Sequence, residues 1–128
     1  MLSHVSVGVS NFDRAFAFYS DVLGVIKVEP RFHDPSEPLA GWQSADGTRP
    51  LFVIGKPHNG QPHDPGNGQM VAFSANTREM VRMAYAKALA LGATCEGPPG
   101  LRPHYHAHYY GAYFRDLDGN KLCAFFSG

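Results

Sequence analysis

The chain has 128 residues and a mass of 14.0 kDa, enough for one domain or for two small modules that share a core. Its 11 Lys and Arg residues balance 11 Asp and Glu residues, so the charge favours neither a nucleic acid nor an anionic membrane surface as partner. With 44% hydrophobic residues the chain can bury a core, and no apolar run approaches the roughly 20 residues of a membrane span. The N-terminus lacks the charged and apolar regions of a leader, which predicts a cytoplasmic protein. The two cysteines, Cys95 and Cys123, are expected to be free thiols.

The first half of the chain predicts a strand followed by a helix. Valine recurs at every second position from residue 5 to residue 9, as in a half-buried strand. Ser10 with Asp13 forms a capping-box pattern, and Gly24 is expected to end the helix. Apolar residues at helical spacing form the face of this helix: Phe12, Ala15, Phe16, Tyr19, Val22 and Leu23.

The second half repeats this order. A strand is predicted over residues 69–75, with Met70 in the position that His4 holds in the first half. Asn76 with Glu79 repeats the cap, and Gly92 is expected to end the second helix. The apolar face of that helix is expected to consist of Met80, Met83, Ala84, Ala88 and Leu91.

An Asp-Gly turn feeds a strand at the end of each half, at residues 46–47 and at residues 118–119. One insertion, at Pro50, aligns Phe52 with Cys123. Each half therefore predicts a strand, a helix and about three further strands. A segment rich in Pro, Gly, Asn and His, about residues 57–68, is expected to link module 1 (about 1–56) to module 2 (about 69–128) within a single domain, 1–128.

Four segments carry a resemblance to a known family: His4–Val7, Phe18–Gly24, Gly66–Phe73 and Phe114–Lys121. They resemble the glyoxalase, bleomycin-resistance and extradiol-dioxygenase superfamily, also called vicinal oxygen chelate proteins. The resemblance covers nearly the whole chain and implies an α+β fold, in which two βαβββ modules place curled mixed sheets around a cavity. Members are usually homodimers, so a homodimer is expected here, with the modules pairing either within one chain or between two.

The resemblance also implies where metal ligands would lie. Metal-binding members place four ligands, typically His and Glu, on inward strand positions, two in each module. These positions fall on His4, Phe52, Met70 and Cys123, so only His4 keeps a usual ligand. No cofactor is predicted; the alternatives are a divalent metal at His4 and a soft metal held by His4, Met70 and Cys123.

Three histidines, His104, His106 and His108, alternate near the C-terminal end. In a strand, alternation would place the three imidazoles on one face. The resemblance puts this segment near the mouth of the cavity, where it could supply ligands or acid–base groups near neutral pH. The alternative is a surface loop in which His and Tyr side chains stack on one another.

The aromatic and arginine residues favour a binding function. Aromatic side chains on inward strand positions, with Tyr113 among them, would line a cavity suited to a planar small molecule. Arg31, Arg102 and Arg115 are candidate clamps for a carboxylate, although an ion pair with a neighbouring hairpin aspartate is favoured for Arg115.

Three functions remain open. The missing ligands favour a protein that binds a small hydrophobic or aromatic molecule, as the resistance-type members do. The second is a metal-dependent lyase or isomerase of the lactoylglutathione lyase type. Among enzymes a lyase is favoured over a dioxygenase, which needs two His and one Glu on iron. The third is a divergent enzyme that uses His4 and the histidines at 104, 106 and 108 as acid–base groups.

Overall fold

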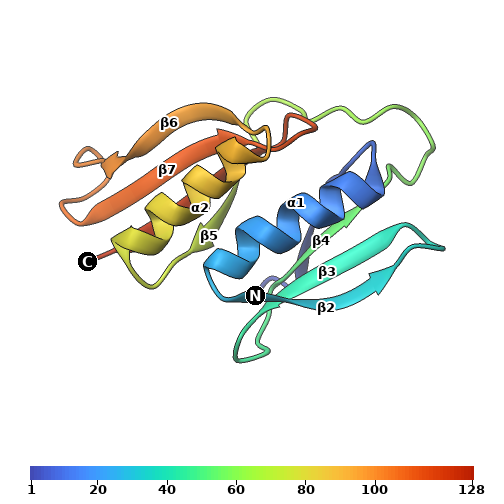
Figure 1. Cartoon of the computed structure of the whole chain (residues 1–128), viewed down its shortest axis with the longest axis horizontal. Helices are drawn as coiled ribbons and strands as arrows, with labels where there is room; N and C mark the ends of the chain where they lie inside the picture. The colour runs from blue at the N-terminus through green and yellow to red at the C-terminus, as the bar shows by residue number, and fades with distance from the viewer. The chain divides into compact units, whose positions relative to one another are not determined.

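The computed structural model describes all residues, 1–128, as two compact units, Met1–Pro65 and Gly66–Gly128. The fold is α+β, and each unit is a βαβββ module with a four-stranded mixed sheet and one helix (Figure 1). Neither helix combines the length and the apolarity needed to span a bilayer.

The first unit contains β1 (His4–Gly8), α1 (Phe12–Val25), β2 (Val28–Asp34), β3 (Leu39–Ser44) and β4 (Leu51–Gly55). Its sheet has the order β1-β4-β3-β2, in which β1 runs parallel to β4 and the other pairs are antiparallel. The core lies between the sheet and α1. Trp42 of β3 and Tyr19 of α1 are almost completely buried there, with ring centroids 5.9 Å apart.

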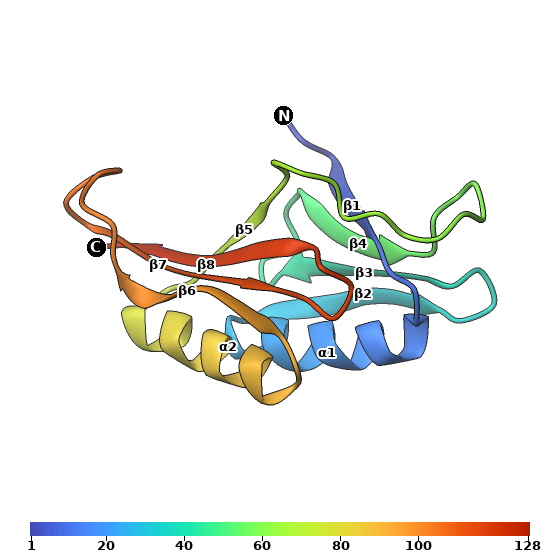
Figure 2. The ribbon, with the colours of Figure 1, turned by 90° about the horizontal axis from the view of Figure 1, so that it is seen from above.

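The second unit contains β5 (Val71–Ser74), α2 (Arg78–Ala90), β6 (Thr94–Leu101), β7 (Tyr109–Arg115) and β8 (Lys121–Ser127). Its sheet has the equivalent order β5-β8-β7-β6, with β5 parallel to β8. The helix α2 lies along one face of this sheet (Figure 2). Val81, Ala84 and Ala88 are buried on the helix, whereas Met83 and Leu91, both predicted for the apolar face, are exposed.

Both helices begin one residue later than the capping patterns predict. The side chain of Asn11, and not that of Ser10, accepts a hydrogen bond of 3.1 Å from the backbone N–H of Arg14. The hydroxyl of Thr77, and not the side chain of Asn76, accepts one of 3.0 Å from the N–H of Met80. In both cases a second polar residue follows the predicted cap, and the sequence spacing does not discriminate between the two.

The helix ends differ between the units. Gly92 follows the last turn of α2 with φ +107°, the left-handed conformation that glycine adopts without steric cost. In the first unit Gly24 lies inside α1, and Lys27 takes the left-handed position with φ +65°. The two Asp-Gly hairpins form as predicted, because Gly47 and Gly119 both have positive φ between antiparallel strands.

Candidate functional site

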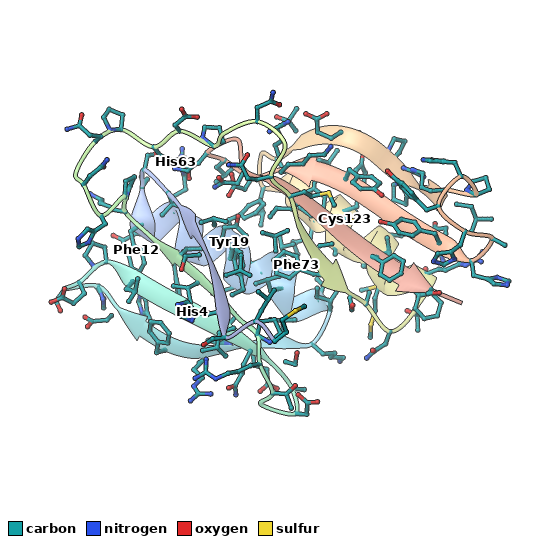
Figure 3. All side chains as sticks on the ribbon, turned by 180° about the vertical axis from the view of Figure 1, so that it is seen from behind. His4, Phe12, Tyr19, His63, Phe73 and Cys123 are labelled. Carbon is teal, nitrogen blue, oxygen red and sulfur yellow. The ribbon has the colours of Figure 1, made fainter.

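The parallel pairing of β1 with β4 decides which side chains share a face with His4. His4 pairs with Leu51 and Ser6 with Val53, and paired residues of parallel strands project to the same side. Phe52 pairs with Val5 on the opposite face and packs against the buried Tyr19, with ring centroids 5.0 Å apart. Phe52 is therefore a core residue of the first unit and shares no face with His4. Figure 3 labels Tyr19 and His4.

The strand pairing of the second unit shows that the sequence alignment of the two repeats is wrong by one residue. Cys123 pairs with Ala72, whereas Leu122 pairs with Val71 and faces the helix, as Phe52 does. The structural equivalent of Cys123 is therefore Val53. Three residues separate Gly47 from β4 but only one separates Gly119 from β8, so the repeat needs two insertions where the sequence comparison allowed one.

The side chains at these positions do not fit the metal that the family resemblance implies. His4 is exposed, and its Nδ1 lies 3.0 Å from the hydroxyl of the adjacent Ser3. Cys123 is fully buried, and this burial raises the pKa of its thiol, whereas a metal ligand must be the thiolate. Glu96, on the face of Cys123, is held in an ion pair with Arg115, and no group of three or more His, Cys, Asp or Glu side chains is placed to hold an ion.

An open pocket of about 640 Å³ lies on the face of the second sheet that is turned away from α2. The side chains of its apolar and aromatic lining come from the end of the linker, from the segment between β6 and β7, and from β7 and β8: Met70, Tyr105, His106, Tyr109, Tyr113 and Phe125. Three residues of the predicted site, Met70, His106 and Tyr113, therefore meet here.

Tyr109 lies at the centre of the rings around this pocket. Its centroid is 4.5 Å from that of Phe125 and 4.9 Å from that of Tyr105. The imidazole of His106 meets Tyr109 edge-on, with centroids 5.5 Å apart. These are the tilted and edge-to-face arrangements that aromatic rings prefer. Ring faces and edges of this cluster line the open pocket and are available to contact a bound molecule.

The floor of the pocket is a short chain of polar atoms. The hydroxyl of Tyr113 donates a hydrogen bond of 2.9 Å to the hydroxyl of Tyr109, which lies 3.9 Å from Sγ of Cys123. Burial raises the pKa of each of these three groups, and the hydrogen bond to Tyr109 raises that of Tyr113 further. All three are therefore neutral near pH 7 and are poorly suited to act as bases or nucleophiles.

Three cationic side chains lie beside the aromatic cluster: Lys121 and Arg115 line this pocket, and Arg102 lines a smaller one that adjoins it. Lys121 Nζ lies 5.7 Å from the ring centroid of Tyr113, and the guanidinium carbon of Arg102 lies 5.4 Å from the same centroid. Arg115 bonds Glu96 at 2.6 Å, so its partner is this residue of β6 and not a hairpin aspartate. The smaller pocket, of about 220 Å³, adjoins the first and shares Tyr105, Tyr113 and Lys121 with it.

The three alternating histidines do not share the face of a strand. Residues 102–108 form turns between β6 and β7, and all three imidazole-bearing residues are exposed. His106 lines the larger pocket and His104 the smaller one, while the backbone N–H of His108 donates to Nδ1 of His106 at 3.2 Å. The stacking of His104 on Tyr105, with centroids 4.2 Å apart, matches the alternative of a loop with stacked rings.

The predicted site residues did not include Tyr105, Tyr109, Phe125 and Lys121, which line this pocket. Tyr109 stands two and four residues before Gly111 and Tyr113, so strand alternation alone places it on the face of Tyr113. Lys121 pairs with Arg115 across the last hairpin, and only the strand register shows that it projects toward the pocket.

The fold and these motifs agree with the comparisons with known proteins. The family model described as Glyoxalase/Bleomycin resistance protein/Dioxygenase superfamily matches residues 1–124. The chain belongs to this superfamily. None of the curated proteins compared with the chain matches it.

Solved structures that are named for this superfamily or for one of its activities match nearly the whole chain. A glyoxalase/bleomycin resistance protein from Albidiferax ferrireducens T118 is 38% identical, covers 98% of each chain and has a TM-score of 0.87. A family enzyme from Burkholderia phytofirmans PsJN is 19% identical, with a TM-score of 0.74 and 98% of each chain covered. A lactoylglutathione lyase from Agrobacterium tumefaciens is 22% identical, with a TM-score of 0.66, 98% of this chain and 92% of its own covered. The last two likenesses show the fold alone.

Proposed function

We propose that this superfamily member binds a small planar aromatic molecule in the larger pocket of its second unit, through side chains and without a metal. The observation that carries the proposal is the ring cluster at the wall of an open pocket, in which the centroid of Tyr109 lies 4.5 Å from that of Phe125 and 4.9 Å from that of Tyr105. Such rings offer large apolar surfaces at little cost in side-chain entropy.

The size and chemistry of the pocket support this proposal. Its volume of about 640 Å³ lies within the range of small-molecule sites, which are mostly apolar with a few polar groups. Each well-placed aromatic contact contributes about 0.5–1.5 kcal/mol beyond the burial of area. The flexible thioether of Met70 can follow the edge of a ligand and contact its ring.

No observation on this chain specifically favours the lyase alternative. Proton transfer next to a carbonyl needs a general base. The one carboxylate that lines either pocket, Glu96, is held by Arg115 in an ion pair that lowers its pKa, so it is a poor base. The histidine-based enzyme loses its basis because His104, His106 and His108 do not share one face. The homodimer and the cytoplasmic location stay predictions.

A thermal-melt screen of the full chain with small aromatic compounds tests this proposal. A ligand at about 100 times its Kd should add about 2.7 kcal/mol to the free energy of unfolding. The same shift is expected with and without a chelator. No shift for any aromatic compound, or a shift that the chelator abolishes, would overturn the proposal.

Matched variants locate the site. Met70 and Met83 are both exposed methionines, but only Met70 lines the pocket. Met70→Ala should weaken ligand binding, whereas Met83→Ala on α2 should leave the Kd unchanged. His106→Ala should also weaken ligand binding, because His106 lines the pocket. His58→Ala, in the linker and outside the pocket, is its control and should leave the Kd unchanged. Equal effects within each pair would place the ligand elsewhere on the molecule.

A further inference from the structure

The cationic residues beside the pocket are not balanced by carboxylates. Lys121, Arg102 and Arg115 lie close to Glu96, which is the one acidic residue that lines either pocket. Glu96 bonds Arg115 at 2.6 Å and also attracts Lys121 electrostatically, so a single carboxylate faces three cations and two positive charges remain in excess. Both remaining cations lie over the ring of Tyr113, within 5.7 Å of its centroid.

These two cations keep hydrogen-bond donors free for a ligand. Arg102 donates to the backbone carbonyl of Pro98 at 2.7 Å and to that of Leu101 at 3.4 Å, which occupies two of its five N–H groups. Those bonds hold the guanidinium in place at the smaller pocket. Lys121 contributes an ammonium group with three donors, and it lines both pockets.

The two pockets differ in what they offer. The larger one is lined by the aromatic cluster and Met70, and the smaller one by Arg102, Glu96 and His104. Tyr105, Tyr113 and Lys121 line both, so they mark the boundary where the pockets adjoin. A ligand that places a ring in the larger pocket would present a substituent to the cations at this boundary.

We infer that the ligand is an aromatic carboxylate, whose ring lies on the aromatic cluster of the larger pocket and whose carboxylate binds Lys121 and Arg102. The inference rests on the proposed function and names the chemical class of its ligand. A carboxylate accepts hydrogen bonds from an ammonium and a guanidinium at once, and such charge-assisted bonds are about twice as strong as neutral ones. A cationic aromatic molecule would instead meet two like charges.

Binding of 2-naphthoate, 2-naphthamide and 2-naphthylmethylammonium to the full chain, measured by titration calorimetry, tests the inference. The three probes share one ring system and differ in charge. 2-Naphthoate should bind about tenfold more tightly than 2-naphthamide, as expected for one or two hydrogen bonds to a charged group. High sodium chloride should weaken only the binding of the naphthoate.

Lysine variants assign the charge preference to the site. Lys121→Met keeps the length of the side chain and removes its charge, so it should reduce the preference for naphthoate over naphthamide. Lys87→Met, on the exposed surface of α2, is the matched control and should leave the preference intact. Arg102→Met gives a second, independent removal of charge if the first variant fails to fold.

The outcomes separate this inference from the function on which it rests. Equal affinity for naphthoate and naphthamide, or tighter binding of the ammonium probe, would overturn the anionic ligand and leave aromatic binding standing. A loss of preference in Lys87→Met as large as that in Lys121→Met would also overturn it. Failure of all three probes to bind would overturn both proposals.

Discussion

The hydroxyl of Tyr113 donates a hydrogen bond of 2.9 Å to the hydroxyl of Tyr109, although four positions of β7 separate the two residues. At strand spacing their Cα atoms lie about 13 Å apart, so both rings must lean along the strand toward each other. Gly111 stands between them, and a Cβ built there would lie 3.1 Å from Cε1 of Tyr109. The absence of a side chain at this position lets the Tyr109 ring lie over the strand and form the wall of the pocket.

Replacing Tyr113 by Phe keeps the ring and removes the donor of this bond. We expect the free energy of unfolding to fall by about 1 kcal/mol, the usual net contribution of one hydrogen bond. Urea denaturation would measure the change. Tyr105→Phe, at an exposed hydroxyl of the same cluster, serves as control and should change stability by less than about 0.5 kcal/mol. An equal loss in both variants would contradict a specific role for the bond.

A side chain at residue 111 should disturb the pocket more than the fold. Gly111→Val places methyl groups where the Tyr109 ring now lies and so forces that ring outward. The affinity for 2-naphthoate should fall by up to about tenfold, because at least one aromatic contact is lost. Titration calorimetry on a variant with a native melt would show this, and an unchanged Kd would contradict the position assigned to the ligand.

The two cysteines should differ in reactivity. Cys95 is exposed and Cys123 is buried, with a pKa raised by that burial. Iodoacetamide should therefore modify Cys95 in the folded protein and reach Cys123 only after denaturation. Peptide mass spectrometry before and after unfolding measures both sites. Modification of Cys123 at the rate of Cys95 under native conditions would show that the thiol is open to solvent.

Alkaline pH should destabilise the fold. Tyr109, Tyr113 and Cys123 all have raised pKa values in the folded state. The unfolded chain releases the same protons at lower pH, about 8.5 for the thiol and about 10 for the phenols, so above these values the unfolded state binds fewer protons. Stability present below about pH 8.5 is then lost as the pH rises. Urea denaturation at several pH values would test this, and Tyr113→Phe should flatten the decline.

The left-handed residue after α1 offers a stabilising substitution. Lys27 has φ +65°, which costs an L-residue about 1 kcal/mol relative to glycine. Lys27→Gly should therefore stabilise the protein by up to about 1 kcal/mol, and thermal and urea denaturation would measure this gain. Gly24→Ala serves as a comparison for the stability change. Gly24 lies inside the helix and a Cβ there meets no atom within 4 Å, so this substitution carries no steric cost. A loss of stability in Lys27→Gly would contradict the steric account.

The order of elements could be predicted from the sequence because it depends on local patterns. Alternating valines, helical spacing of apolar residues and Asp-Gly turns each act over a few positions, and they identify both βαβββ modules and the family. The capping patterns came within one residue of the observed caps, Asn11 and Thr77. Either of the two adjacent polar residues is chemically able to cap the helix, so the packing of each helix determines which of them does.

The composition of the candidate site depended on strand register, which no local pattern supplies. A one-residue change in the length of a hairpin turn moves every following side chain to the other face of the sheet. That shift places Phe52 in the core and makes Val53 the equivalent of Cys123. The contact of Tyr109 with Tyr113, and the position of Lys121 beside them, likewise arise only when β7 and β8 pair. Local sequence patterns were therefore sufficient to predict the modules and the family, whereas the residues that form the pocket follow from the pairing of the strands.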